Sequence, residues 1–190
     1  MGIRIVADSC CDLPAEIIKD FNIGIVQLLV RFGERVYQPG EISNNDFYRL
    51  MEASPILPST TQPALEELTR VYTDGSQVLA IHFSSGISGT FQGAQVAQKM
   101  LDNPNLTVFD SRKASVGCGL MVLEAARMAQ IGHDLQTILE RLEEMRQHLQ
   151  CLFTVGNMEY LIKGGRISRS KGTLANILDI KPILHFDRDG

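Results

Sequence analysis

The pattern that most limits the fold is a buried strand followed at once by a hydroxyl-rich loop and a helix. Its clearest copy is the near-continuous apolar run VLAIHF at 78–83, which leads through SSGISGT into a helix reaching about Leu101. Strands at 3–7 and 106–109 lead in the same way through DSCCD and DSRKAS into helices. Strands that alternate with helices predict an α/β fold with a parallel sheet flanked by helices.

The hydroxyl-rich loops are expected to meet. In a parallel sheet the carboxyl ends of the strands lie along one edge, and ligands bind in the crevice outside that edge. DSCCD, SSGISGT and DSRKAS should therefore share one crevice, and PSTTQP at 58–63 is a candidate to join them.

Turn residues and periodicity predict the other elements. Asp12, Ser43 and Asp134 are the expected N-caps of helices at 15–21, 43–53 and 135–149, with Asp46 forming a looser capping box behind Ser43. Further expected elements are an extended segment at 23–32, a hairpin arm at 34–37 with Gly33 in the turn, helices at 64–72 and 116–131, a strand at 152–155, a helical MEYLI ending in KGGR, and a final helix and strand up to Phe186.

The length of 190 residues allows one complete domain and part of a second. The predicted boundary lies near residue 150, which gives an N-terminal α/β head-group domain at 1–150 and the start of a C-terminal α/β domain at 151–190. Asp189-Gly190 after an apolar run is a hairpin signal whose returning strand is missing, so we expect a fragment of a longer protein. A frayed natural C-terminus is the alternative.

Composition argues against several classes. The net charge is -4, and the 18 Lys and Arg residues are spread along the chain, so nucleic acid is not an expected partner. Neither a secretory leader nor an apolar run of roughly 20 residues is visible, which predicts a cytoplasmic protein without an integral membrane segment. The four cysteines lack CxxC spacing and are interpreted as reduced and structural; a reactive Cys10-Cys11 pair is the alternative.

The SSGISGT loop carries the strongest chemical signal. Ser84, Ser85, Ser88 and Thr90 place hydroxyl donors between a strand and a helix N-terminus, and glycines allow the backbone to approach a ligand. Unpaired amides and the helix dipole favour a carboxylate or phosphate there. Plain N-capping by Ser88 is the alternative, and neither familiar nucleotide-binding glycine motif is present.

Other polar residues permit two interpretations each. PSTTQP is either a rigid loop that offers Thr60, Thr61 and Gln62 as donors or a polar turn between helices. Asp8 and Asp110 either perform acid–base or metal chemistry or cap the loop amides that follow them, and we favour capping because no metal motif accompanies them. His82, within an apolar strand, is interpreted as a hydrogen-bonded core histidine and not a general base.

Five motifs in this order, DSCCDLP, STTQP, SSGISGTFQGA, FDSRKASVGCG and YLIKGGRIS, resemble the DegV family of bacterial lipid-binding proteins over the whole chain. The resemblance implies a two-domain α/β protein that holds one long-chain fatty acid and needs no cofactor or metal. It also implies a partner, a fatty acid kinase that phosphorylates the presented carboxylate for phospholipid synthesis. The chain itself would then not be an enzyme.

By the same resemblance, the head-group residues would be Thr60 or Thr61 and Ser88 with Gly89, and Arg166 of KGGR would lie near the pocket mouth or at the kinase surface. Ser85 and Thr90, hydroxyls of the same SSGISGT loop, are further predicted ligand-binding residues. The sequence departs from the family at Cys10 and Cys11, where small hydroxyl residues or alanine are common, and at Thr61, where serine is common. Family members also continue into a second domain that supplies further pocket wall and a histidine near the carboxylate.

A fatty acid further requires an apolar tunnel. Methylene burial contributes roughly 0.8 kcal/mol each, about 12 kcal/mol for ~16 carbons, against association costs of roughly 4–15 kcal/mol. Residues near the loops that could line a tunnel, or simply be core, are Leu28, Leu29, Val30, Ile56, Leu57, Phe91, Leu120 and Met121. Two other classes stay open: an enzyme acting on a small phosphorylated or carboxylated metabolite, and a scaffold without a ligand.

Overall fold

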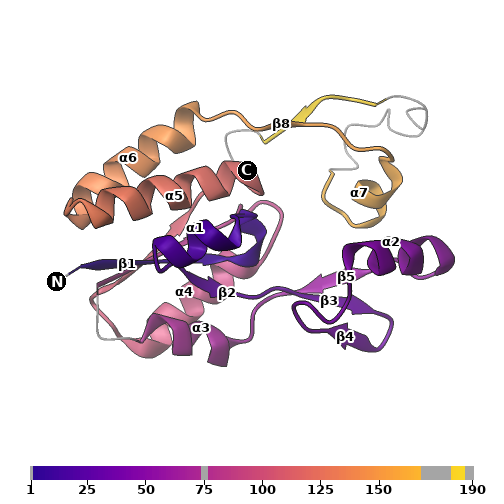
Figure 1. The fold of residues 1–190 in the computed structure, drawn as a ribbon, viewed down its shortest axis with the longest axis horizontal. Coiled ribbons are helices and arrows are strands. Elements are labelled where there is room, and N and C mark those ends of the chain that lie inside the picture. The colour runs from indigo at the N-terminus through magenta and orange to yellow at the C-terminus, as the bar shows by residue number, and fades with distance from the viewer. Residues whose placement is uncertain (1, 74–76, 168–180, 187–190) are drawn as a thin grey trace. The chain divides into compact units, whose positions relative to one another are not determined.

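Four parallel strands form the sheet that carries the predicted loops (Figure 1). They are β1 (Ile3–Asp8), β2 (Gly24–Val26), β6 (Gln77–His82) and β7 (Leu106–Asp110), in the spatial order β2-β1-β6-β7. The three predicted strand-loop-helix units therefore stand in one sheet with the same direction. This confirms the α/β fold with a parallel sheet flanked by helices.

Helices cover both faces of this sheet (Figure 1). On one face lie α1 (Ala15–Asp20), α5 (Val116–Gln130) and α6 (Leu135–His148), and on the other lie α3 (Leu65–Tyr72) and α4 (Thr90–Leu101). Successive strand residues point to opposite faces, so Ile5 and Ala7 join the α5–α6 core while Val6 joins the α3–α4 core. Two covered faces explain why β6 is apolar at nearly every position.

The computed structural model describes residues 2–73, 77–167 and 181–186. The chain divides into two compact units: unit 1 contains residues 1–28, 62–151 and 186–190, and unit 2 contains 29–61 and 152–185. Residues 29–61, placed by the sequence analysis in the N-terminal domain, thus group with residues that follow position 151. The proposed domain boundary near 150 stays a prediction.

Unit 2 contains two small antiparallel sheets. One has the order β4-β3-β5, from β3 (Leu29–Phe32), β4 (Arg35–Tyr37) and β5 (Ser59–Thr61), and the other pairs β8 (Leu152–Phe153) with β9 (Leu184–His185). The helices among the described residues of this unit are α2 (Asn44–Ala53) and α7 (Glu159–Lys163). The predicted hairpin is confirmed, with Gly33 at a φ of 56° in the β3–β4 turn, as is the Ser43 cap, whose Oγ accepts from the Asp46 amide at 3.1 Å.

Two local predictions are wrong, and a third needs refinement. Asp12 does not cap α1; it ends a short 3₁₀ turn, η1 (Ser9–Cys11), in the left-handed region at a φ of 48°, and Pro14 holds the N-cap position. The segment predicted as extended at 23–32 does form strands, but it is divided between β2 and β3, which belong to different sheets. Ser59–Thr61 is neither a loop nor a turn but the strand β5, because β-branched threonines favour a strand when β3 offers an edge.

Two further predictions, the final helix after KGGR and the Asp189-Gly190 turn, fall on positions 168–180 and 189–190, outside the described residues. The other predicted helices and strands agree with the structure to within a few residues at their ends.

Candidate functional site

The carboxyl ends of β1, β6 and β7 meet in unit 1, as predicted. Ala7 is paired with Ile81, and His82 with Asp110, so the three following loops leave the sheet at the same edge. Backbone bonds then join the loops: the Ser84 amide donates to the Lys113 carbonyl, and the Ser115 amide to the Cys10 carbonyl, both at 2.9 Å. The crevice edge is therefore one hydrogen-bonded assembly and not three independent loops.

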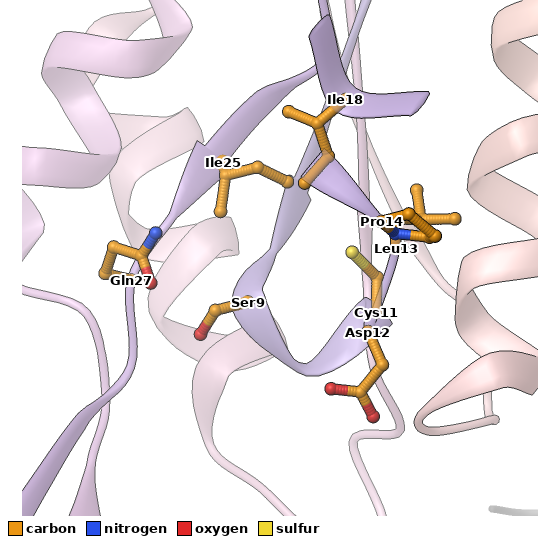
Figure 2. Close-up of a pocket in the computed structure, with 8 residues that line it drawn as sticks. All are labelled: Ser9, Cys11, Asp12, Leu13, Pro14, Ile18, Ile25 and Gln27. Atoms are coloured by element: carbon orange, nitrogen blue, oxygen red, sulfur yellow. The ribbon is translucent and has the colours of Figure 1, made fainter. Parts of the chain in front are cut away.

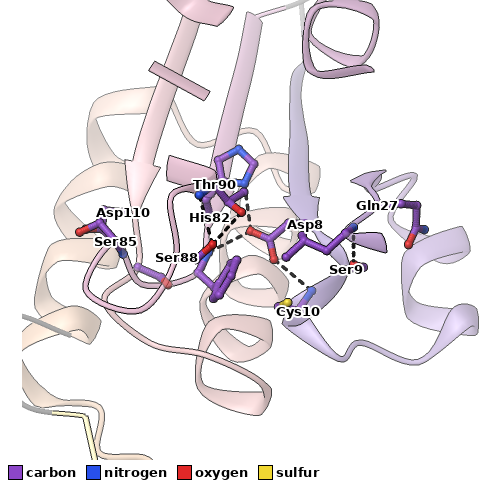
Figure 3. Close-up of polar contacts among 12 residues, drawn as sticks. Asp8, Ser9, Cys10, Gln27, His82, Ser85, Ser88, Thr90 and Asp110 are labelled. Carbon is purple, nitrogen blue, oxygen red and sulfur yellow. Dashed lines mark hydrogen bonds and ion pairs between the residues drawn. The ribbon is translucent and has the colours of Figure 1, made fainter. Parts of the chain in front are cut away.

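Asp8 ends β1 at the centre of this edge, and its side chain is fully buried. One carboxylate oxygen, Oδ1, accepts from the Cys10 amide at 3.0 Å. The other, Oδ2, accepts from the Phe83 amide and faces His82 Nδ1, each at 3.0 Å (Figure 3). This confirms that Asp8 caps loop amides, and it adds a link to the next strand that the sequence did not indicate.

His82 is also fully buried, and its second ring nitrogen, Nε2, lies 2.6 Å from the hydroxyl of Tyr72 on α3. Both ring nitrogens therefore have partners inside the core. The interpretation of His82 as a hydrogen-bonded core histidine is confirmed. A single histidine in an apolar strand indicated that a polar partner exists, but Tyr72 could not be identified from the sequence.

Asp110 ends β7 and holds the start of the β6 loop. Its Oδ1 accepts from the amides of Ser85 and Arg112, at 3.2 and 3.0 Å, and its Oδ2 accepts from the Ser85 hydroxyl at 2.6 Å (Figure 3). Capping by Asp110 is thus confirmed. The bond also commits the single hydroxyl hydrogen of Ser85, which would have to leave Asp110 before it could donate to a ligand.

Ser88, Gly89 and Thr90 form the entrance to α4. Ser88 Oγ accepts from the Thr90 amide at 3.2 Å and lies 3.0 Å from Thr90 Oγ1. Thr90 is fully buried, whereas Ser88 is partly exposed. The Thr90 hydroxyl can donate to Ser88 Oγ, and the Ser88 hydroxyl then keeps its own hydrogen for a ligand. The N–H groups in the first turn of a helix have no acceptor within the helix. In α4 these include the N–H groups of Phe91 and Gln92.

Gln62 lies against this entrance. A Cβ at Gly89 would stand only 2.0 Å from Gln62 Nε2, so glycine is required there for the amide to approach. Gln62 and Gly89 help to line a small cavity of about 360 Å³ beside the start of α4. The sequence indicated Gln62 only as one of three possible donors in PSTTQP. It did not indicate that Gln62 lies against Gly89.

Three of the predicted site residues belong to unit 2. Thr60 and Thr61 lie on β5, opposite Val30 and Leu29 of β3. Arg166 is exposed just after α7, where its guanidinium donates to the Gly164 carbonyl at 2.6 Å. The ligand roles of these residues, and those of Ser85, Ser88, Gly89 and Thr90, stay predictions.

A larger cavity, of about 590 Å³, opens beside η1 in unit 1 (Figure 2). Apolar side chains and a thiol line much of it, from Cys11, Leu13, Pro14, Ile18 and Ile25, while Ser9, Asp12 and Gln27 supply polar groups. Its volume lies within the range of roughly 300–1,000 Å³ found for small-molecule sites. Among the residues expected to line a tunnel, Met121 is instead fully buried core, and Leu120 and Ile56 are exposed.

Cys10, Cys11 and Cys118 are held as thiols. Burial, reinforced by the charge of Asp8, raises the pKa of Cys10 to about 12, and burial raises that of Cys11 to about 11. Burial also raises the pKa of Cys118. A thiolate is the reactive form, so these values support structural cysteines over a reactive Cys10-Cys11 pair.

Within the described ranges, no group of three or more His, Cys, Asp or Glu side chains is placed to hold a metal ion. No helix in the same ranges is long and apolar enough to cross a membrane.

Comparison with known proteins gives consistent matches. A family model described as an uncharacterised protein of the DegV family matches residues 2–190. Protein DegV of Bacillus subtilis is 35% identical over 193 residues, which cover 98% of this chain and 69% of that protein. A DegV domain-containing protein of Clostridium perfringens is 35% identical over 188 residues, which cover 96% of this chain and 67% of that protein.

Solved structures agree with these matches. A DegV family protein from Thermus thermophilus, described for its fatty acid binding, has a TM-score of 0.90 at 33% identity, over all of this chain and 69% of its own. DegV of Bacillus subtilis, described as a fatty acid binding protein, has a TM-score of 0.86 at 34% identity with the same coverage. A stearic acid-binding protein from Eubacterium ventriosum has a TM-score of 0.87 at 27% identity, over 98% of this chain and 68% of its own. Given these matches and the loop order around its sheet, the chain belongs to the DegV family.

Proposed function

We propose that this protein binds a long-chain fatty acid and presents its carboxylate to a fatty acid kinase. The observation that carries the proposal is that unit 1 contains both a hydroxyl-lined helix N-terminus and a mostly apolar cavity. The chain is also similar to structures described as binding fatty acids. An acid with a long apolar tail is the ligand class that needs both features.

The head group would bind at the start of α4. Ser88 has a hydroxyl hydrogen to donate, the amides of Phe91 and Gln92 are unpaired within the helix, and the helix dipole favours an anion at that end. Thr90 supports Ser88 from the buried side, and Gly89 admits the Gln62 amide. Thr60 and Thr61 are proposed as additional donors, as in the family resemblance.

The acyl chain would enter the cavity beside η1. Burial of a tail of about 16 carbons contributes about 12 kcal/mol gross to binding. The loss of translational and rotational freedom on association costs roughly 4–15 kcal/mol, which is a similar amount. Tight binding therefore needs a lining as apolar as that of Leu13, Ile18 and Ile25. The Cys11 thiol is a further weakly polar wall.

The bonding of the two acids and the histidine supports a carrier more than an enzyme. Asp8 and Asp110 accept from loop amides, and His82 is bonded at both nitrogens, so these groups are already committed to the fold. A general base must reach the proton it removes. We propose accordingly that the chain is non-catalytic and leaves phosphorylation of the carboxylate to the kinase. We further propose that it acts in the cytoplasm and that Arg166 lies in the surface on which the kinase docks.

The direct test is mass spectrometry of small molecules released by denaturing the protein purified from bacteria. The expected result is one fatty acid per chain, and extraction without lipid would contradict the proposal. A phosphorylated or carboxylated metabolite in its place would favour the enzyme alternative. Acyl-phosphate formation with a purified fatty acid kinase tests presentation separately.

A further inference from the structure

A buried hydrogen-bonded chain joins three elements of unit 1. It runs from Asp8 at the end of β1, through His82 at the end of β6, to Tyr72 at the end of α3, and all three side chains have no exposed surface. Asp8 Oδ2 lies 3.0 Å from His82 Nδ1, and His82 Nε2 lies 2.6 Å from the Tyr72 hydroxyl. Buried polar chains of this kind are retained only when each member is satisfied.

The donors and acceptors of this chain can be assigned. Burial, and then the charge of Asp8, raises the pKa of Tyr72, so its hydroxyl keeps its hydrogen. The acceptor that the structure provides for this hydrogen is His82 Nε2, which must then carry none. His82 Nδ1 holds the ring hydrogen and donates it to the Asp8 carboxylate. This assignment places the ring hydrogen of His82 on Nδ1.

This assignment makes Asp8 the acceptor of three donors. They are His82 Nδ1–H, the Phe83 amide that begins the SSGISGT loop, and the Cys10 amide within η1. Tyr72 extends the connection to α3, which follows Gln62 and Pro63 in the chain. One buried carboxylate thus fixes the loops after β1 and β6, and the hydroxyl of Tyr72 ties α3 to them.

We propose that Asp8, His82 and Tyr72 are positioning residues that set the geometry of the head-group donors without touching the ligand. The inference rests on the proposed function, because it assumes that a carboxylate is bound at the start of α4. A carboxylate that accepts several charge-assisted bonds depends on donor geometry more steeply than an alcohol does. Loosening the buried chain should therefore reduce affinity for a fatty acid more than for the matching fatty alcohol.

The test is Tyr72→Phe, which removes one oxygen and leaves His82 Nε2 without its donor. Dissociation constants for palmitic acid and hexadecanol are measured by calorimetry on the delipidated protein. The acid's constant should rise about tenfold, which is about 1.4 kcal/mol, and the alcohol's no more than about threefold. Ile138→Val, a one-methylene deletion at a fully buried position of α6, is the control and should leave the ratio of the two constants unchanged.

A spectroscopic measurement tests the assignment without any ligand. Long-range nitrogen–proton NMR correlations of ¹⁵N-histidine-labelled protein should show His82 as the Nδ1–H form in the unaltered protein. An Nε2–H form or an imidazolium would overturn the assignment. Equal effects of Tyr72→Phe on acid and alcohol would overturn the positioning role, whereas failure of the proposed function itself would appear as absence of fatty-acid binding by the unaltered protein.

Discussion

Ser88 combines two roles at one oxygen. As an acceptor it binds the Thr90 amide, and as a donor it has a hydrogen left for a ligand, since Thr90 Oγ1 can supply the hydrogen of their shared bond. The alternative of plain N-capping by Ser88 is wrong, because Gly89 holds the N-cap position of α4 and the bond from the Thr90 amide belongs to a local turn before the helix.

We predict that Ser88→Ala weakens fatty-acid affinity by about 10- to 100-fold, because a charge-assisted hydrogen bond contributes roughly 1.5–3 kcal/mol. The stability of the ligand-free protein should fall by only about 1 kcal/mol, the usual net contribution of one hydrogen bond. Titration with a fatty acid and with the corresponding alcohol measures the effect, and the acid should lose more. Ser43→Ala, which removes the cap of α2, should cost similar stability with no change in affinity.

The raised pKa of Cys10 predicts how the stability of the fold depends on pH. The pKa of Cys10 is raised from 9.0 to about 12 in the folded protein, so between these values the unfolded chain loses a proton that the folded chain keeps. The folded state then binds more protons, and stability must fall as pH rises above about 9. Below pH 9 the thiol is protonated in both states and stability is unaffected.

Urea unfolding at pH 8 and at pH 10.5 measures this effect. Cys10→Ala should reduce the loss of stability between the two pH values. An identical pH dependence in the unaltered protein and in Cys10→Ala would show that the thiol does not contribute.

Among the elements, η1 and α5 approach each other closely. A Cβ at Gly119 on α5 would lie 2.3 Å from the Cys11 carbonyl oxygen, a backbone atom that cannot turn aside as a flexible side chain can. The close contact lets α5 hold η1, whose Cys11 lines the larger cavity. The sequence shows the glycine but not its partner, because the contact depends on how α5 packs against η1.

Gly119→Ala should therefore destabilise the protein by about 1–3 kcal/mol or more, the cost of overpacking. Gly93 on α4 provides the matched control, since a Cβ there would meet its nearest neighbours at an ordinary 3.7 Å. Gly93→Ala should stabilise by up to about 1 kcal/mol, because alanine is the better helix former. Chemical denaturation of both variants decides the matter, and equal outcomes would contradict the packing argument.

How far the sequence predicts the structure differs between elements for physical reasons. The apolar run of β6 has a clear signal because both faces of the sheet are covered. Thr60 and Thr61 were misassigned because a three-residue strand is decided by its partner β3 and not by local pattern. Convergence of the three loops followed from strand direction alone, while the bond from His82 to Tyr72 depends on how α3 packs, which no local pattern encodes.

At the scale of the whole molecule, the proposed function needs two separable properties, retention of a lipid and encounter with a kinase. The head-group and cavity residues argued above lie largely in unit 1, while Arg166 lies in unit 2. Arg166 follows Gly165, which adopts a φ of 74°, and its side chain is exposed. A cation displayed in this way can steer docking to an acidic protein surface.

We predict that Arg166→Ala lowers the rate of acyl-phosphate formation with the kinase several-fold, while the dissociation constant for the fatty acid changes little. Steering of this kind acts on the association rate, so the loss should shrink as salt is raised. Lys163→Ala is the matched control: it removes a cation of α7 that is already paired with Glu159, and should have a smaller effect. Comparing kinase rates with lipid affinity for both variants separates the two properties, and a parallel loss of affinity in Arg166→Ala would place this residue in the lipid pocket instead.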